Sequence, residues 1–184
     1  MKNWYLIAVT PPAETAEEID QLRKEFAEKY ACQRALKPPV HLTLSEPFEI
    51  RQELEPKLMR LLTGIGLHQM PFEQSLNGFG HFGKEVIYIK ADQHEKLMSL
   101  KKEIRRHIRK RFGHKDRHSF KPHYTIAYRD LSEEMYTKAY EEYQHREFSA
   151  SYLCETITLL RYDDYKLIPL QTFPLRGQET LRLF

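Results

Sequence analysis

The tetrapeptides His41-Leu42-Thr43-Leu44 and His123-Tyr124-Thr125-Ile126, which begin 82 residues apart, decide the architecture that this sequence predicts. Side chains at positions i and i+2 of a strand point to the same face, so in each copy the histidine and the threonine share one face and the other face is apolar. Burying such a polar face is costly, so we expect it to line a wet cleft. A bare His-x-Thr match arises about 0.5 times by chance in this composition. Requiring an apolar residue after both the histidine and the threonine lowers this to about 0.1.

The elements around the two motifs repeat in the same order. An apolar strand at 4–9 precedes an amphipathic helix at 14–29, and a strand at 86–89 precedes a helix at 93–111. Each pair is displaced by about 80 residues, as in a duplicated unit. The other expected elements are helices near 54–65 and 135–143, strands near 72–79 and 156–162, and a closing strand from Tyr165 to Leu175.

The repeat predicts an α+β fold with two similar β-α-β-α-β lobes and antiparallel-rich sheets around a central cleft, related by a pseudo-twofold axis. The chain would be a single domain, 1–184, with lobes at roughly 1–82 and 83–184 and with the last strands able to cross between lobes. Asp163-Asp164 is interpreted as the turn between those strands.

The composition is that of an ordinary globular protein, with 41% hydrophobic and 30% charged residues, which excludes disordered, collagen-like and coiled-coil chains. The apolar run at 4–9 is too short for a signal peptide, and no run approaches the roughly 18 residues of a membrane span. Cys32 and Cys154 form neither a disulfide framework nor a CxxC site and are interpreted as buried thiols. We expect a cytoplasmic monomer with no membrane partner.

The two motifs, together with Gly78-Phe79-Gly80-His81-Phe82 and Phe120-Lys121-Pro122-His123, resemble the paired HxTx motifs of the two-histidine phosphoesterase superfamily. Within it they are similar to the 2′-5′ RNA ligase and cyclic phosphodiesterase family, and the likeness covers nearly the whole chain. It implies a bilobal fold and chemistry without a metal or cofactor on a 2′,3′-cyclic phosphate or a 2′-5′ phosphodiester. The implied partner is RNA, or a nucleotide, that carries a cyclic phosphate.

Two imidazoles and two hydroxyls also suit this chemistry on physical grounds. Hydrolysis of a cyclic phosphodiester deprotonates water on one side of phosphorus and protonates the departing ribose oxygen on the other. Histidine can do either near neutral pH, and a threonine hydroxyl can donate to a phosphate oxygen. As a hypothesis, His41 is the general acid and His123 the general base, which gives a 2′-phosphate, with Thr43 and Thr125 binding the phosphate. The sequence leaves open which histidine has which role.

Charge is unevenly placed along the chain. The net charge is +3, but residues 101–121 hold ten Lys or Arg against Glu103 and Asp116, a balance of +8, which leaves −5 elsewhere. Arg117 and Lys121 precede the second motif directly and are the candidate additional phosphate contacts. The basic helix side chains are either a solvated face or an RNA-backbone surface, and both interpretations stay open: Arg105, Arg106, Arg109 and Lys110.

The sequence is also compatible with other functions and with other site residues. The chain could be a non-catalytic RNA- or nucleotide-binding module, or a phosphodiesterase for a small cyclic nucleotide such as ADP-ribose cyclic phosphate. No metal-ligand spacing is present, so the histidines between 107 and 118 are interpreted as solvated members of the basic stretch. Three aromatic residues could stack on a base but are more typical of a core: Tyr5, Phe48 and Phe79.

Overall fold

The computed structural model describes residues 1–164 and 166–178, so Tyr165, the expected start of the last strand, lies outside the described residues. The fold is α+β, as the sequence predicts. Its elements are β1 (Lys2–Val9), α1 (Ala13–Tyr30), η1 (Arg34–Leu36), β2 (Leu42–Arg51), η2 (Gln52–Leu54), α2 (Glu55–His68), β3 (Phe72–Phe82), β4 (Val86–Ala91), α3 (Glu95–Phe112), β5 (His123–Tyr128), α4 (Glu133–Tyr143), β6 (Ser149–Cys154), β7 (Thr156–Asp163) and β8 (Lys166–Pro174).

The strands form two four-stranded sheets in which neighbouring strands are antiparallel. Sheet A has the order β2-β1-β7-β8 and sheet B the order β5-β4-β3-β6. The predicted boundary between residues 82 and 83 does not separate them, because β3 and β4 form a hairpin across it with Phe82 opposite Val86. Strands β7 and β8 complete sheet A beside β1.

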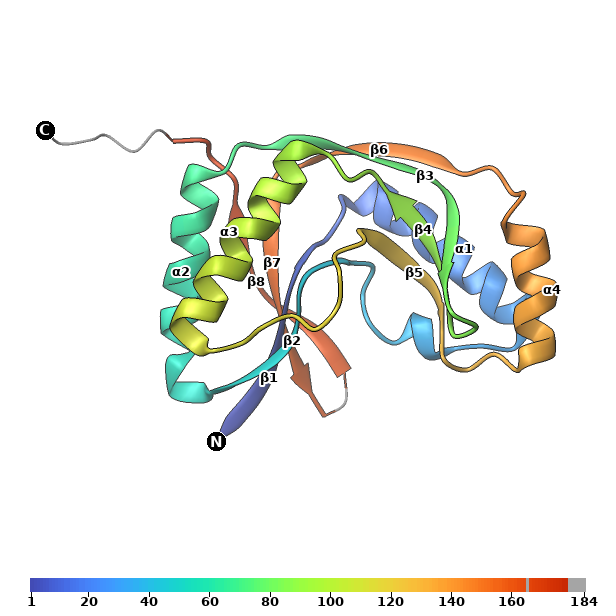
Figure 1. Ribbon diagram of the computed structural model, residues 1–184, viewed down its shortest axis with the longest axis horizontal. Helices are drawn as coiled ribbons and strands as arrows, with labels where there is room; N and C mark the ends of the chain where they lie inside the picture. Colours follow the sequence, from blue (N-terminus) through green and yellow to red (C-terminus); the bar gives the residue numbers. More distant parts are fainter. Residues whose placement is uncertain (165, 179–184) are drawn as a thin grey trace, which may run out of the picture.

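The helices that follow the first strand of each repeat are exchanged between the sheets (Figure 1). Helix α1 leaves β1 of sheet A but packs on β5 and β6 of sheet B, beside α4. Helix α3 leaves β4 of sheet B but packs on β2 of sheet A, beside α2, which covers β7 and β8. Each of these helices buries one apolar stripe, Ile19, Leu22 and Phe26 in α1 and Leu97, Leu100, Ile104 and Ile108 in α3.

Each sheet therefore turns one face to its helices and the other to the space between the sheets. In β1, Tyr5, Ile7 and Val9 belong to the main core, whereas Leu6 and Ala8 form a separate small cluster with two residues of β7 and β8, Leu160 and Leu167. Strand β2 alternates in the same sense, with Leu42 and Leu44 in the core and Thr43 only partly buried.

Residues that were interpreted as structural lie in the core. Tyr5, Phe48 and Phe79 are buried, so their rings are not available to a ligand. Cys32 and Cys154 are buried free thiols, and burial raises their pKa to about 11 and about 12, respectively. Thiols with such pKa values are protonated and unreactive at neutral pH. None of the helices in residues 1–164 and 166–178 combines the length and apolarity of a membrane span.

Candidate active site

Both His-x-Thr motifs line one cavity of about 270 Å³ between the sheets. His41 directly precedes β2 of sheet A and Thr43 is the second residue of that strand, whereas His123 and Thr125 belong to β5 of sheet B. All four side chains belong to partly buried residues, and no other described residue makes a hydrogen bond to either threonine hydroxyl. The structure thus brings these four predicted residues together with both hydroxyls available to a ligand.

A second chamber of about 490 Å³ shares Thr43, His123 and Thr125 with the first. Lys121 lines this chamber, with its Nζ 5.9 Å from the centre of the Phe82 ring. Arg117 is exposed and lines neither chamber. Of the two basic residues that the sequence suggests as phosphate contacts, only Lys121 lies at the cleft.

The two histidines are held in the same way. His41 Nδ1 lies 2.7 Å from the carbonyl oxygen of Pro39, and His123 Nδ1 lies 2.6 Å from that of Lys121, in each case two residues earlier. A carbonyl oxygen can only accept, so each Nδ1 carries the proton and donates it. The Nε2 atom of each neutral ring therefore has its lone pair free for proton transfer.

Burial governs the charge of both rings. It lowers the pKa of His41, with smaller contributions in the same direction from Arg23 and His123, against the opposing effect of the Pro39 carbonyl. Burial also lowers the pKa of His123, against the effect of the Lys121 carbonyl. Both imidazoles are therefore mainly neutral at pH 7, so either can act as a base at once and the one acting as an acid must first gain a proton.

Aromatic rings fix the orientation of His123. Phe82 meets it edge-on with 4.9 Å between ring centres, and Tyr88 lies at the same separation on a tilted plane. A Cβ atom at Gly80 would come within 2.7 Å of the Tyr88 ring, so glycine is needed there for Tyr88 to reach His123.

Comparison with known proteins places this arrangement in a family. The profile described as the 2′-5′ RNA ligase superfamily matches residues 11–166. The chain belongs to the 2′-5′ RNA ligase superfamily. It is 27% identical over 180 residues to a Geobacillus kaustophilus protein named putative phosphoesterase, covering 96% of this chain and 99% of that one. A protein of the same name from Geobacillus sp. strain WCH70 is 30% identical, covering 74% of this chain and 75% of its own.

Solved structures share the fold. Escherichia coli LigT complexed with 3′-AMP superposes with a TM-score of 0.70 and 22% identity, covering 95% of this chain and 99% of LigT. The protein TT0787 of Thermus thermophilus gives a TM-score of 0.67 at 23% identity, with 96% and 100% of the two chains covered. The fold that this chain shares with these two proteins therefore extends over nearly its whole length.

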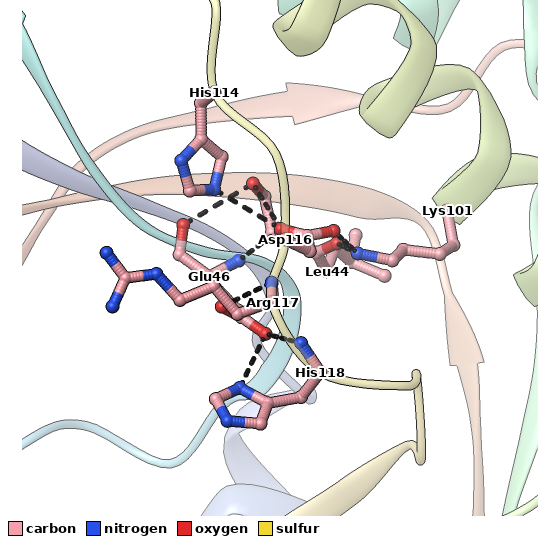
Figure 2. Close-up of polar contacts among 8 residues, drawn as sticks. Leu44, Glu46, Lys101, His114, Asp116, Arg117 and His118 are labelled. Carbon is pink, nitrogen blue, oxygen red and sulfur yellow. Dashed lines mark hydrogen bonds and ion pairs between the residues drawn. The ribbon is translucent and has the colours of Figure 1, made fainter.

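A network of charged residues connects residues 113–121, which we call the basic loop, to strand β2 (Figure 2). The Asp116 carboxylate accepts from the Glu46 backbone N–H at 3.0 Å and pairs with Lys101, whose Nζ also donates to the Leu44 carbonyl at 2.6 Å. The Glu46 carboxylate in turn accepts from the backbone N–H groups of Arg117 and His118, at 3.0 and 2.9 Å. The loop that leads into His123 is thereby fixed to the strand that carries Thr43.

This network corrects part of the sequence interpretation. His114 is not solvated, because its ring stacks on Phe48 at 5.3 Å and its Nε2 lies 3.3 Å from Asp116. His107 is also partly buried and lies 3.4 Å from Glu103, whereas His118 is exposed. Within residues 1–164 and 166–178 no three His, Cys, Asp or Glu side chains are grouped so that they could hold a metal ion.

Sequence reasoning missed Arg23, which lines the first chamber. Its side chain is buried, donating to the Pro38 carbonyl at 2.9 Å and pairing with Asp20 at 3.3 Å. The signal was present, because position 23 is four residues after Ile19 and three before Phe26, on the buried face of α1.

Proposed function

We propose that the protein is a metal-independent phosphodiesterase that opens RNA 2′,3′-cyclic phosphate ends to 2′-phosphates, with 2′-5′ ligation and cleavage as related activities of the same site. The observation that carries the proposal is the cavity in which two imidazoles with free Nε2 atoms and two unengaged threonine hydroxyls meet.

In the hydrolytic direction His123 Nε2 takes a proton from water, whose oxygen forms a bond to phosphorus. The bond between phosphorus and the ribose O3′ breaks, and His41, in its protonated form, gives its Nε2 proton to that oxygen. Thr43 and Thr125 donate to the non-bridging oxygens, where negative charge increases in the transition state. The phosphodiester anion itself favours the protonated form of His41 that the step needs.

Ligation follows from the same groups when a ribose 5′-hydroxyl replaces water. His123 then deprotonates the 5′-hydroxyl, its oxygen bonds to phosphorus, and O3′ again leaves with the proton of His41. The product is a 2′-5′ phosphodiester, and its cleavage is the reverse of these steps. Hydrolysis and ligation thus use the same acid and base, and in cleavage of the 2′-5′ phosphodiester the two roles exchange, with His123 giving the proton to O5′ and His41 accepting that of O3′.

Nucleotide recognition is supported by the relatives. LigT has been crystallised with 3′-AMP, NADP+ and ATP, all of which are nucleotides. The second chamber, with Phe82, Phe120 and Tyr128 beside Lys121 and Arg129, has the mixed aromatic and cationic lining that suits a nucleoside next to a phosphate.

The test is to incubate the protein with nucleoside 2′,3′-cyclic phosphates in EDTA and to identify the monophosphate by chromatography. We expect 2′-phosphates, and a loss of about 10²- to 10⁴-fold in kcat for His41→Ala and for His123→Ala. His145→Ala, an exposed histidine outside the cleft, is the matched control and should keep full activity.

Three results would contradict the proposal. Full activity in either motif variant would exclude the two-histidine mechanism. Binding of cyclic oligonucleotides without turnover would indicate a binding module, and a kcat/KM that is much higher for ADP-ribose cyclic phosphate than for RNA ends would assign a small-molecule substrate.

A further inference from the structure

A groove of about 580 Å³ runs between α2 and α3, and it shares no lining residue with the two chambers of the cleft. Its sides are mainly basic, and we refer to it as the basic groove. The lining residues on which the argument depends are Lys57, Arg60 and Gly64 from α2 and Glu103, Arg106 and Arg111 from α3.

The charges in the basic groove are not balanced by the protein. Glu103 is the one carboxylate among its lining residues, and it already pairs with Arg106 at 2.8 Å and lies 3.4 Å from His107. Over the part of the chain that the structure describes, Lys57, Arg60 and Arg111 make no ion pair. Cations gathered on facing helices repel one another, so an anion in the groove would lower the energy of this arrangement.

Gly64 keeps the floor of the groove open. A Cβ atom there would meet nothing within 4 Å, whereas one at Gly66 would come within 2.5 Å of the Pro174 carbonyl oxygen. Packing therefore requires glycine at 66 but not at 64, although glycine weakens a helix interior relative to alanine. An occupant lying on this floor would account for the missing side chain.

The cations are spread along the groove rather than gathered around one point. Its cations are Lys57 and Arg60 on α2 and Arg106 and Arg111 on α3, and its lining extends from Lys57 to His68, eleven residues or about 16 Å along α2. That length suits several successive phosphates of one polymer better than a single phosphate group. Lys57 and Arg111 are exposed, so a polymer can reach them from solvent.

One stretch of chain leads from the groove to the cleft. Helix α3 ends at Phe112, and the basic loop continues from there to β5 (Figure 1). The loop carries the exposed residues Lys115 and Arg117 and ends at Lys121, which lines the second chamber. Arg117, which has no place in the cleft, thus lies on the stretch of chain between groove and cleft.

We propose that the basic groove binds the sugar-phosphate backbone of a single-stranded RNA whose cyclic phosphate end lies in the cleft. In naming RNA, this inference rests on the proposed function. The inference also assigns different roles to the basic residues of α3. Arg106 and Arg111 line the groove and would contact RNA, whereas Arg105 and Arg109 do not line it.

The experiment measures binding of a labelled single-stranded oligoribonucleotide with a plain 3′ end, by fluorescence anisotropy over a series of salt concentrations. Lys57→Gln, Arg60→Gln and Arg111→Gln are combined in one variant. The matched control combines Lys102→Gln, Arg105→Gln and Arg109→Gln, which remove the same charge from exposed positions outside the groove.

Each phosphate contact contributes about 0.7 to the slope of log K against log salt for a single strand, so the groove variant should lose about 2 from this slope. The ratio of wild-type affinity to variant affinity should therefore be about a hundredfold larger at 0.1 M salt than at 1 M salt. The control variant should lose much less of this slope. The Gly64→Glu variant should bind the oligoribonucleotide more weakly than the Gly64→Gln variant, because it adds a negative charge to the groove.

An equal loss in the groove variant and its control would overturn the inference, because it would show only general attraction. Competition by polyglutamate as strong as that by RNA would overturn the assignment to nucleic acid. Hydrolysis of a nucleoside 2′,3′-cyclic phosphate should be unchanged in the groove variant, and a loss of hydrolysis as large as the loss of RNA binding would overturn the assignment of RNA binding to the groove. If the wild type hydrolyses no cyclic phosphate, the proposed function fails, while the salt slopes still decide whether the groove binds RNA.

Discussion

Replacing Asp116 with asparagine removes the charge that faces the buried ammonium group of Lys101. The two side chains are only 6% and 10% exposed, so the variant leaves an uncompensated charge in the interior. Removing one partner of a buried pair costs about 3–5 kcal/mol. We expect a cost of about 3 kcal/mol, at the lower end of that range, because the asparagine oxygen can still accept from the Glu46 N–H. For a chain of this size the melting temperature should fall by about 6–12 °C.

The assay is urea unfolding of the wild type, Asp116→Asn, Lys101→Met and the double variant. The double variant should cost less than the sum of the two single variants, by about 1–3 kcal/mol, because the side chains interact directly. Lys138→Met breaks an exposed pair with Glu134 and should cost less than about 1 kcal/mol. A loss below about 1 kcal/mol for Asp116→Asn, or additive single variants, would refute the reasoning.

The pH dependence of the Asp116 effect has a definite sign. Lys101 and the Glu46 N–H hold the pKa of Asp116 below its usual range, against the opposing effect of burial, so its contribution to stability is fully present above pH about 4. This contribution is lost as the pH falls through the lowered pKa of the folded state. The difference between the wild type and Asp116→Asn should therefore narrow in acid, as urea titrations at several pH values would show.

Other perturbations test the site and the packing. Burial lowers the pKa of both His41 and His123 below the usual value of about 6.5. As the pH rises toward that value, His123 loses its proton and becomes an active base, but His41 also loses the proton that it needs as an acid. The maximum of kcat/KM should therefore lie on the acid side of that value, and a pH–rate profile that peaks above pH about 7.5 would contradict it. Thr43→Val should lower kcat by roughly 10²-fold with little change in KM, measured by steady-state kinetics. In thermal unfolding, Gly66→Ala should destabilise the protein by about 1–3 kcal/mol and Gly64→Ala should stabilise it by up to about 1 kcal/mol. The opposite order would contradict the close contact of residue 66 with Pro174 and the open space at residue 64.

Local pattern was sufficient to predict most helices and strands and the shared face of the site residues. His41 and Thr43 follow strand alternation, and the apolar stripe of α3 repeats at helical spacing, so both could be inferred from neighbours in sequence. Strand β6 was missed because its first residues, Ser149, Ala150 and Ser151, are small and give no alternation of apolar and polar side chains.

Long-range pairing was beyond the reach of such patterns. The apolar stripe of α1 is the same whether the helix covers sheet A or sheet B, so its placement on sheet B could not be inferred. The pairing of Lys101 with Asp116 could not be inferred from the basic stretch 101–121, because a sequence does not show which charges become buried. Arg117 was assigned to the cleft from its nearness to His123 in sequence, but its side chain lies outside both chambers.

The exchange of α1 and α3 has a consequence for how the protein folds. The chain passes from one lobe to the other and back several times, so neither sheet can acquire its helical cover from a continuous segment of sequence. A fragment ending at residue 82 would contain β1, β2 and α2, but it would lack α3, which covers β2, and β7 and β8, on which α2 packs. We therefore expect both lobes to unfold in one cooperative transition, in which the two halves of the active site are lost together.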